Sequence, residues 1–140
     1  VSNFTDAHIE RIVDATGVVP AVNQIEVHPY FANDSLRYAS AARGVAVEAW
    51  SPIAQGAVLG DPVIGEVAAR VERTPAQVAL RWAIQRGDIV FPKSMSQARM
   101  AENFALFDFE LADSDMDAIS GLDRDGRTGP DPDVFDWIPA

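Results

Sequence analysis

The 140 residues suffice for one domain of ordinary size or for part of a larger one. With 11 Lys and Arg against 21 Asp and Glu, the net charge is −10, which argues against a nucleic acid or a membrane surface as the partner. The absence of cysteine excludes disulfides, thiolate metal sites and a cysteine nucleophile, no apolar run approaches the ~20 residues of a membrane helix, and we expect a cytoplasmic location.

Short apolar runs alternate with amphipathic stretches along the chain. We predict, in order, a helix at 5–17, a strand at 22–27, a helix at 34–44, a strand at 45–50, a short helix within 61–71, a helix at 74–87, a strand at 89–91, and helices at 96–104 and 114–122. Three of the helices close on a glycine, and Thr74-Pro75 is a typical helix start. Strands that alternate with helices predict βαβ units around a parallel sheet, and therefore an α/β fold.

The two ends of the chain differ from its middle. Residues 123–140 are rich in Gly, Pro and Asp, which predicts a C-terminal loop or tail, either laid over a surface or poorly ordered, after a folded unit at 1–122. The first residues, Val1 to Phe4, include no methionine, basic leader or apolar signal core. We interpret the chain as the interior of a longer protein that has been cut open.

Polar residues interrupt strands that should be apolar if a parallel sheet buries them on both faces. Gln24, Glu26 and Glu48 are the examples. They either form a satisfied hydrogen-bond network in the interior of a barrel or sheet, or some of them face a ligand. In βα folds the working residues lie where strands end, which keeps the second interpretation open.

Lys93 is the most informative residue, because it is the only lysine in the chain. It directly follows a predicted strand, stands beside Ser94, and precedes a predicted helix that carries Arg99. A lysine, a hydroxyl, an arginine and the free N–H groups of a helix start together suit an anion such as a phosphate. The alternative is a solvated surface lysine with an unrelated arginine.

Other chemistries find little support in the sequence. His8 and His28 have no second histidine at metal spacing, so we expect no metal site, and we expect His8 to face solvent. No glycine-rich phosphate loop is present, which argues against Rossmann and P-loop units. Ser51 lacks the flanking residues of a hydrolase nucleophile.

Four motifs, in order, resemble those of the aldo-keto reductases, which are NADPH-dependent (β/α)₈-barrel oxidoreductases. The motifs are Val1 to Phe4, Pro20 to Tyr30, Glu48 to Ile53, and Phe91 to Ser94 with Arg99, Glu102 and Asn103. The match runs to about Leu111 and implies the C-terminal half of a TIM barrel whose N-terminal half is missing. Within the family, the pattern is most similar to a bacterial branch like the 2,5-diketo-gluconate reductases or prostaglandin F synthases.

The resemblance implies a cofactor site for NADPH or NADP⁺. At the nicotinamide end, Ser2, Asn3 and Gln24 would hydrogen-bond the carboxamide, and Trp50 would stack on the ring where the family usually has tyrosine. The other implied contacts are Ser51 and Ile53 along the pyrophosphate, Lys93, Ser94 and Arg99 on the phosphate of the adenosine ribose, and Glu102 and Asn103 on the adenine. Trp137 in the tail is a candidate contact with the substrate.

The resemblance also implies that the catalytic groups lie outside this chain. The family's catalytic Asp, Tyr, Lys and His stand on earlier strands, so we expect no catalytic residue here and no activity from the isolated chain. The full-length parent would be an enzyme that reduces a small aldehyde or ketone to an alcohol by hydride transfer, without nucleic-acid or membrane partners and as a monomer. The alternatives are a non-catalytic NADPH-binding module like the potassium-channel β-subunits and an unrelated phosphate-binding barrel.

Overall fold

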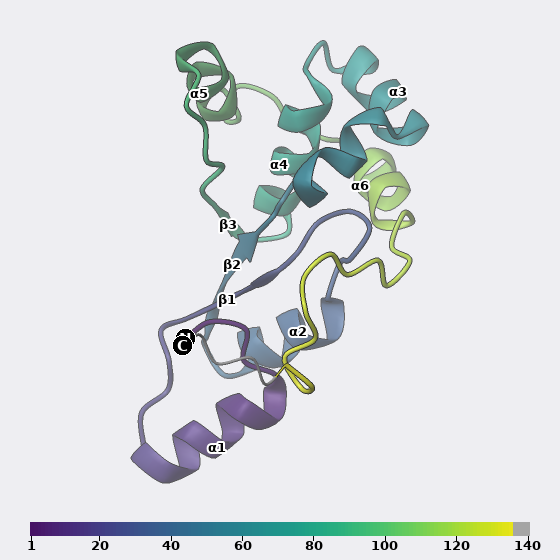
Figure 1. Cartoon of the computed structure of the whole chain (residues 1–140). Helices are drawn as coiled ribbons and strands as arrows, with labels where there is room; N and C mark the ends of the chain where they lie inside the picture. The colour runs from purple at the N-terminus through teal and green to yellow at the C-terminus, as the bar shows by residue number, and fades with distance from the viewer. Residues whose placement is uncertain (136–140) are drawn as a thin grey trace.

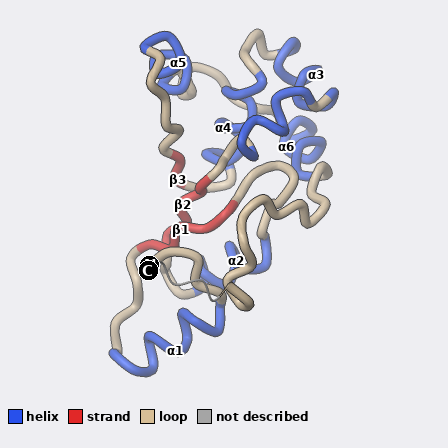
Figure 2. The backbone as a smooth tube through the Cα atoms, in the orientation of Figure 1, coloured by secondary structure: helices blue, strands red, loops and turns tan. Residues whose placement is uncertain are grey.

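A parallel sheet forms the centre of the computed structural model, which describes residues 1–135 (Figure 2). Its strands are β1 (Val22–Glu26), β2 (Ala46–Trp50) and β3 (Ile89–Val90), in the order β1-β2-β3. The first residues extend the sheet beyond β1, because Ser2 pairs with Gln24 in an isolated parallel bridge. The predicted parallel βα arrangement is therefore confirmed, with the third strand ending one residue earlier than expected.

Helices connect and flank these strands, close to the predicted bounds (Figure 1). They are α1 (Asp6–Thr16), α2 (Asp34–Ala42), the 3₁₀ segment η1 (Ala54–Gly60), α3 (Pro62–Arg70), α4 (Pro75–Gln85), α5 (Gln97–Phe104) and α6 (Asp113–Ser120). The sequence did not predict η1, in which Ala54 and Gln55 have positive φ angles of 48° and 54°. Among residues 1–135, no helix is long and apolar enough to cross a membrane.

Local chemistry explains where the principal helices begin. The Thr74 side chain accepts a hydrogen bond from the Gln77 backbone N–H at 3.2 Å, and Pro75 occupies the first helical position of α4. Asp61 caps α3 in the same manner by accepting from the Val63 N–H at 2.9 Å. These caps satisfy backbone donors that have no partner inside the helix. They were readable in the sequence because they depend on neighbouring residues only.

The apolar core joins β1 and β2 to helices α3, α4 and α6. Its fully buried members include Ile25, Val27, Ile64, Val78, Trp82 and Ile119. The Trp82 indole N–H donates to the Ser120 hydroxyl at 3.0 Å, which ties α4 to α6. This packing holds the carboxyl ends of β2 and β3 in fixed positions beside the starts of η1 and α5.

Apolar side chains are exposed around the free edge of β3. Phe91 is 51% exposed, and Phe104 and Phe107 are 82% and 72% exposed. With Ile89 and Met100 they line an apolar hollow of about 700 Å³ between β3 and α5. Exposed apolar clusters of this kind mark surfaces that another segment or protein covers.

Candidate functional site

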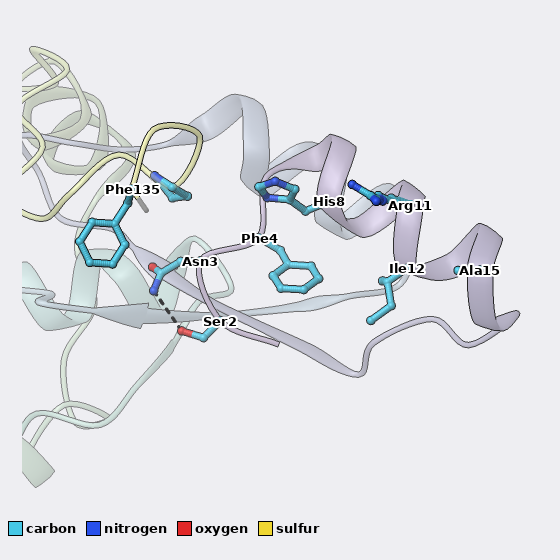
Figure 3. A pocket seen from close by; sticks show the side chains of 9 residues that line it. Ser2, Asn3, Phe4, His8, Arg11, Ile12, Ala15 and Phe135 are labelled. Carbon is cyan, nitrogen blue, oxygen red and sulfur yellow. Dashed lines mark hydrogen bonds between the residues drawn. The ribbon is translucent and has the colours of Figure 1, made fainter. Parts of the chain in front are cut away.

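The first three residues of the chain pair with the middle of β1, at Gln24. The Asn3 N–H donates to the Gln24 carbonyl at 2.8 Å, and the Gln24 N–H donates to the Val1 carbonyl at 3.0 Å. Asn3 has a φ of 56°, a left-handed conformation that asparagine tolerates better than most residues. Its side-chain amide donates to the Ser2 hydroxyl at 3.2 Å, as Figure 3 shows.

Trp50 links the end of β2 to this corner. Its indole N–H donates to the Asn3 side-chain oxygen at 2.8 Å, across the end of β1. Glu48 stands two residues before Trp50 on the same face of the sheet, and its carboxylate accepts from the Gln24 amide at 3.3 Å. Gln24 and Glu48 therefore hydrogen-bond each other, as the first interpretation of the polar strand residues, a hydrogen-bond network, requires, and Gln24 lines neither the cavity nor the neighbouring hollow of this site. The network fixes the indole on which a planar ring could stack.

A single cavity of about 800 Å³ runs along the carboxyl ends of β2 and β3. The predicted cofactor residues on its wall are Trp50, Ser51, Ile53, Lys93, Ser94, Arg99, Glu102 and Asn103. Ser2 and Asn3 line a neighbouring hollow of about 570 Å³ beside α1, which Figure 3 shows, and reach the cavity through the Asn3–Trp50 hydrogen bond. The wall of the cavity thus brings together residues from β2, Trp50 among them, and residues as far along the chain as Asn103.

The cationic end of the cavity is built on the loop from β3 into α5. The Ser94 hydroxyl accepts from the Ser96 N–H at 3.1 Å, and the Ser96 hydroxyl caps α5 by accepting from the Arg99 N–H at 3.4 Å. These bonds hold the loop in a tight turn. Lys93 and Arg99 are exposed on it, and with Ser94 and Ser96 they also line a smaller hollow of about 480 Å³.

Charge pairing sets Lys93 and Arg99 apart from most other cations. The arginines that pair with a carboxylate are Arg37, Arg43, Arg70, Arg73, Arg81 and Arg86. Within the described residues, neither Lys93 nor Arg99 forms such a pair, although acidic residues outnumber basic ones by almost two to one. Two neighbouring unpaired cations over a helix N-terminus can receive an anion.

Helix α5 is held against the start of α4. The Glu102 carboxylate accepts from the Thr74 hydroxyl at 2.5 Å, and the Gln77 side chain donates to the Glu102 carbonyl at 3.2 Å. Sequence reasoning found Glu102 but missed Thr74 and Gln77 as the residues that place it. The Thr74-x-x-Gln77 capping pattern indicated a helix start, but it carried no information on the contact with α5.

A buried acidic group and a histidine form a second polar centre below this site. The Glu26 carboxylate lies 3.0 Å from His28 Nε2, and the two side chains are 1% and 0% exposed. Burial lowers the pKa of His28 more than the neighbouring Glu26 raises it, so the imidazole is neutral at neutral pH. Within the described residues, no cluster of His, Cys, Asp and Glu could hold a metal ion.

His8 lies outside the cavity wall described above. His8, expected to face solvent, is partly exposed on α1, where its Nδ1 accepts from the Thr5 N–H at 3.2 Å and its ring meets that of Phe4 at 5.7 Å. Trp137, the candidate substrate contact, lies outside the described residues. Leu59 of η1 also lines the cavity, and no sequence pattern pointed to it, because the bend of η1 depends on positive φ angles at Ala54 and Gln55 that these residue types rarely adopt.

Comparison with known proteins identifies the family. The model of the Aldo/keto reductase family matches residues 1–124. An aldo-keto reductase of Mycolicibacterium smegmatis is 50% identical over 98% of the chain, and methylglyoxal reductase DkgA of Escherichia coli is 42% identical over 96% of it. The chain belongs to the aldo-keto reductase family, as the motifs predicted.

Solved structures confirm the predicted fold. The crystal structure of apo Gox0644 matches 98% of the chain with a TM-score of 0.95 and 50% identity, and so does a mutant of Gox0644 in complex with NADPH. The chain spans about half the length of these proteins and of the curated relatives. It has the architecture of half of an aldo-keto reductase barrel. We use "complete barrel" below for this chain joined to the half that it does not span.

The neutral state of His28 predicts a pH dependence of stability. Because its pKa is below 6.5 in the folded protein, the unfolded chain binds more protons below pH 6.5 and folding is weakened there. The urea midpoint of the complete barrel should therefore be lower at pH 5.5 than at pH 7.5. His28→Gln should reduce this difference, and His8→Gln should preserve it because His28 remains. An equal difference in the His28→Gln variant and the wild type would contradict the assignment.

Proposed function

We propose that this chain supplies the cofactor site of an NADPH-dependent enzyme that reduces small aldehydes or ketones to alcohols. The observation that carries the proposal is the single cavity lined by the Trp50 indole and by Lys93 and Arg99, which have no carboxylate partner among the described residues. Support comes from the family, from the NADPH complex of a similar protein and from relatives named methylglyoxal reductase. The cofactor, once bound, supplies the hydride.

Successive regions of the cavity wall suit successive parts of the NADPH molecule. Trp50 offers a flat apolar surface for the nicotinamide ring, and Ser2, Asn3 and Gln24 provide amide and hydroxyl groups for its carboxamide. Ser51 and Ile53 follow directly along the cavity wall, where we assign the pyrophosphate. A stacked ring presents one face to the substrate, so this end of the site determines which face of the nicotinamide ring delivers the hydride.

The adenosine end carries the preference for the phosphorylated cofactor. Lys93, Ser94 and Arg99 would bind the phosphate on the ribose through charge-assisted hydrogen bonds. Glu102 and Asn103 lie on the cavity wall one helical turn further, where we assign the adenine. The contact between Glu102 and Thr74 holds that wall in place before any ligand arrives.

Neither tyrosine of this chain is placed to supply the proton that completes the reduction. Tyr30 is 8% exposed and donates its hydroxyl hydrogen to Asp61 at 2.8 Å, and burial raises its pKa. Tyr38 is 68% exposed on α2, and neither tyrosine lines the cavity. We therefore assign the general acid and its partners to the half of the barrel that the chain does not span.

Removing the amide of Asn3 should lower turnover in the complete barrel. Asn3→Ala loses the hydrogen bond to the Trp50 indole and the proposed carboxamide contact, so the ring is held less firmly for hydride transfer. We expect kcat to fall by roughly tenfold, corresponding to about 1.4 kcal/mol. Gln24→Ala should have the same direction of effect.

The measurement is NADPH oxidation with methylglyoxal at saturating cofactor. Gln97→Ala on α5, an exposed residue outside the cavity lining, is the matched control and should keep wild-type kinetics. Unchanged kcat in Asn3→Ala and Gln24→Ala would remove these residues from the nicotinamide site. Binding of NADPH without any turnover in the wild-type complete barrel would favour the binding-module alternative.

A further inference from the structure

The Glu26 carboxylate is the partner of a segment more than a hundred residues away. It accepts hydrogen bonds from the Thr128 backbone N–H at 2.6 Å, from the Gly129 N–H at 3.0 Å and from the Thr128 hydroxyl. Residues 123–135, which we call the tail, carry no helix or strand and cross the end of β1 (Figure 1). These bonds join the tail to the sheet.

The hydrogen bonds to Glu26 maintain a buried negative charge. Burial alone raises the pKa of this carboxyl, but the bonds from Thr128, Gly129 and His28 together outweigh burial and hold the pKa below its ordinary value. Within the described residues, no lysine or arginine pairs with Glu26. A buried carboxylate without partners is costly, so the tail supplies what this position of β1 requires.

The approach of the tail is fixed by contacts with the loop after β1. The Gly126 and Arg124 N–H groups donate to the Tyr30 carbonyl at 2.8 and 3.3 Å. The Arg124 guanidinium lies 3.7 Å from the centre of the Tyr30 ring, and that of Arg127 lies 4.5 Å from the centre of the Phe31 ring. Two backbone bonds and two cation–π contacts therefore place Thr128 and Gly129 over Glu26.

Gly129 brings the tail against the indole of Trp50. A Cβ atom at Gly129 would lie 2.4 Å from Trp50 Cη2 and 3.2 Å from Glu26 Oε2, so the backbone leaves no room for a side chain there. The indole is held on its other side by the hydrogen bond to Asn3. The position of Trp50 thus depends on the seating of the tail.

We propose that Glu26 is a positioning residue that anchors the tail and, through Gly129, fixes the Trp50 indole. The anchoring stands on the contacts of Glu26 alone, whereas its effect on the cofactor rests on the function proposed above. When the hydrogen bonds between Glu26 and the tail are lost, the tail opens locally. The Trp50 indole is then held only by its hydrogen bond to Asn3 and gains freedom to turn about it. Loosening of the tail therefore changes the surface on which the nicotinamide ring would stack.

The first measurement is amide hydrogen exchange of residues 126–129 in the complete barrel. Glu26→Gln keeps the shape but loses the charge, and we expect exchange to accelerate by roughly tenfold or more, as charge-assisted hydrogen bonds are lost. The amides of Leu80 and Trp82 in the core of α4 should stay protected, which shows that the fold is intact. Glu10→Gln on the exposed face of α1 is the matched control. Equal exchange in Glu26→Gln and the wild type overturns the proposal.

Thr128→Val provides a second variant outside the core, for use if Glu26→Gln does not fold. It removes the hydroxyl donor and retains both backbone donors, so exchange should accelerate by a smaller factor of roughly threefold. Wild-type exchange in this variant would contradict a role for the carboxylate as the anchor, because the variant loses one of the three hydrogen bonds that the tail donates to Glu26.

The second measurement follows the indole by ¹⁹F NMR of the complete barrel labelled with fluorotryptophan. Glu26→Gln and Gly129→Ala should both shift or broaden the Trp50 resonance and leave that of buried Trp82 unchanged, with Trp50→Phe used to assign the signal. An unmoved Trp50 resonance in both variants overturns the link to the indole.

The anchor and the proposed function can fail independently of each other. If the tail and the indole respond but the wild type does not bind NADPH, the proposed function fails and the anchor stands. If NADPH is turned over but neither measurement responds, the anchor fails alone.

Discussion

In the complete barrel, Lys93→Ala or Arg99→Ala should raise the Kd for NADPH by roughly tenfold to a hundredfold and leave the Kd for NADH within about threefold. Each variant would remove one of the charge-assisted contacts that we propose with the extra phosphate, worth about 1.5–3 kcal/mol, and NADH lacks that phosphate. The two side chains have no carboxylate partner among the described residues, so no competing ion pair is lost.

The comparison needs a control for net charge. Arg43→Ala removes the same charge from the end of α2, where the arginine forms a surface ion pair with Asp6. It should leave both dissociation constants unchanged, since surface pairs contribute little to stability and this one lies outside the cavity lining. The measurement is isothermal titration calorimetry with each cofactor. Equal losses of NADPH and NADH affinity in the Lys93 and Arg99 variants would contradict the phosphate assignment.

The isolated 140-residue chain should melt without a sharp transition and should neither bind NADPH well nor catalyse reduction. Its sheet has two free edges, at the residues before α1 and at β3, and Phe91, Phe104 and Phe107 are exposed beside the second edge. In a complete barrel both edges would be paired and this surface covered. The complete barrel should therefore show one cooperative heat-absorption peak that the isolated chain lacks.

Differential scanning calorimetry of both proteins under the same conditions checks this expectation. The complete barrel is the matched control, since it contains the same 140 residues. Methylglyoxal reduction can be followed with the same samples. A sharp transition of the isolated chain would show that the core around Trp82 and Ile119 folds without the rest of the barrel, and would overturn the expectation.

Features that depend on neighbouring residues could be predicted from the sequence. The capping residues Thr74 and Asp61 and the glycine after α1 located helix ends to within a few residues. The meeting of Trp50 with Lys93 on one cavity wall was also predictable, because strand ends of a parallel sheet share one edge. Motif resemblance then assigned the order of the contacts along that edge.

Features that depend on distant pairs could not be predicted. Glu26 stood out as a polar residue in a strand, but nothing near it in the sequence pointed to Thr128 and Gly129. The contact arises because the tail returns across the end of β1, and no local pattern encodes that path. The bend of η1 was missed for a related reason, since Ala54 and Gln55 adopt positive φ angles that their residue types rarely take.

In the proposed cofactor site, Lys93 and Arg99 bind the phosphate on the adenosine ribose. A crystal structure of the complete barrel with NADP⁺ tests it most directly. We expect phosphate oxygens within hydrogen-bond distance of Lys93 Nζ and the Arg99 guanidinium, with the nicotinamide ring stacked on Trp50. A dinucleotide bound elsewhere, or both side chains turned into solvent with no anion beside them, would contradict it.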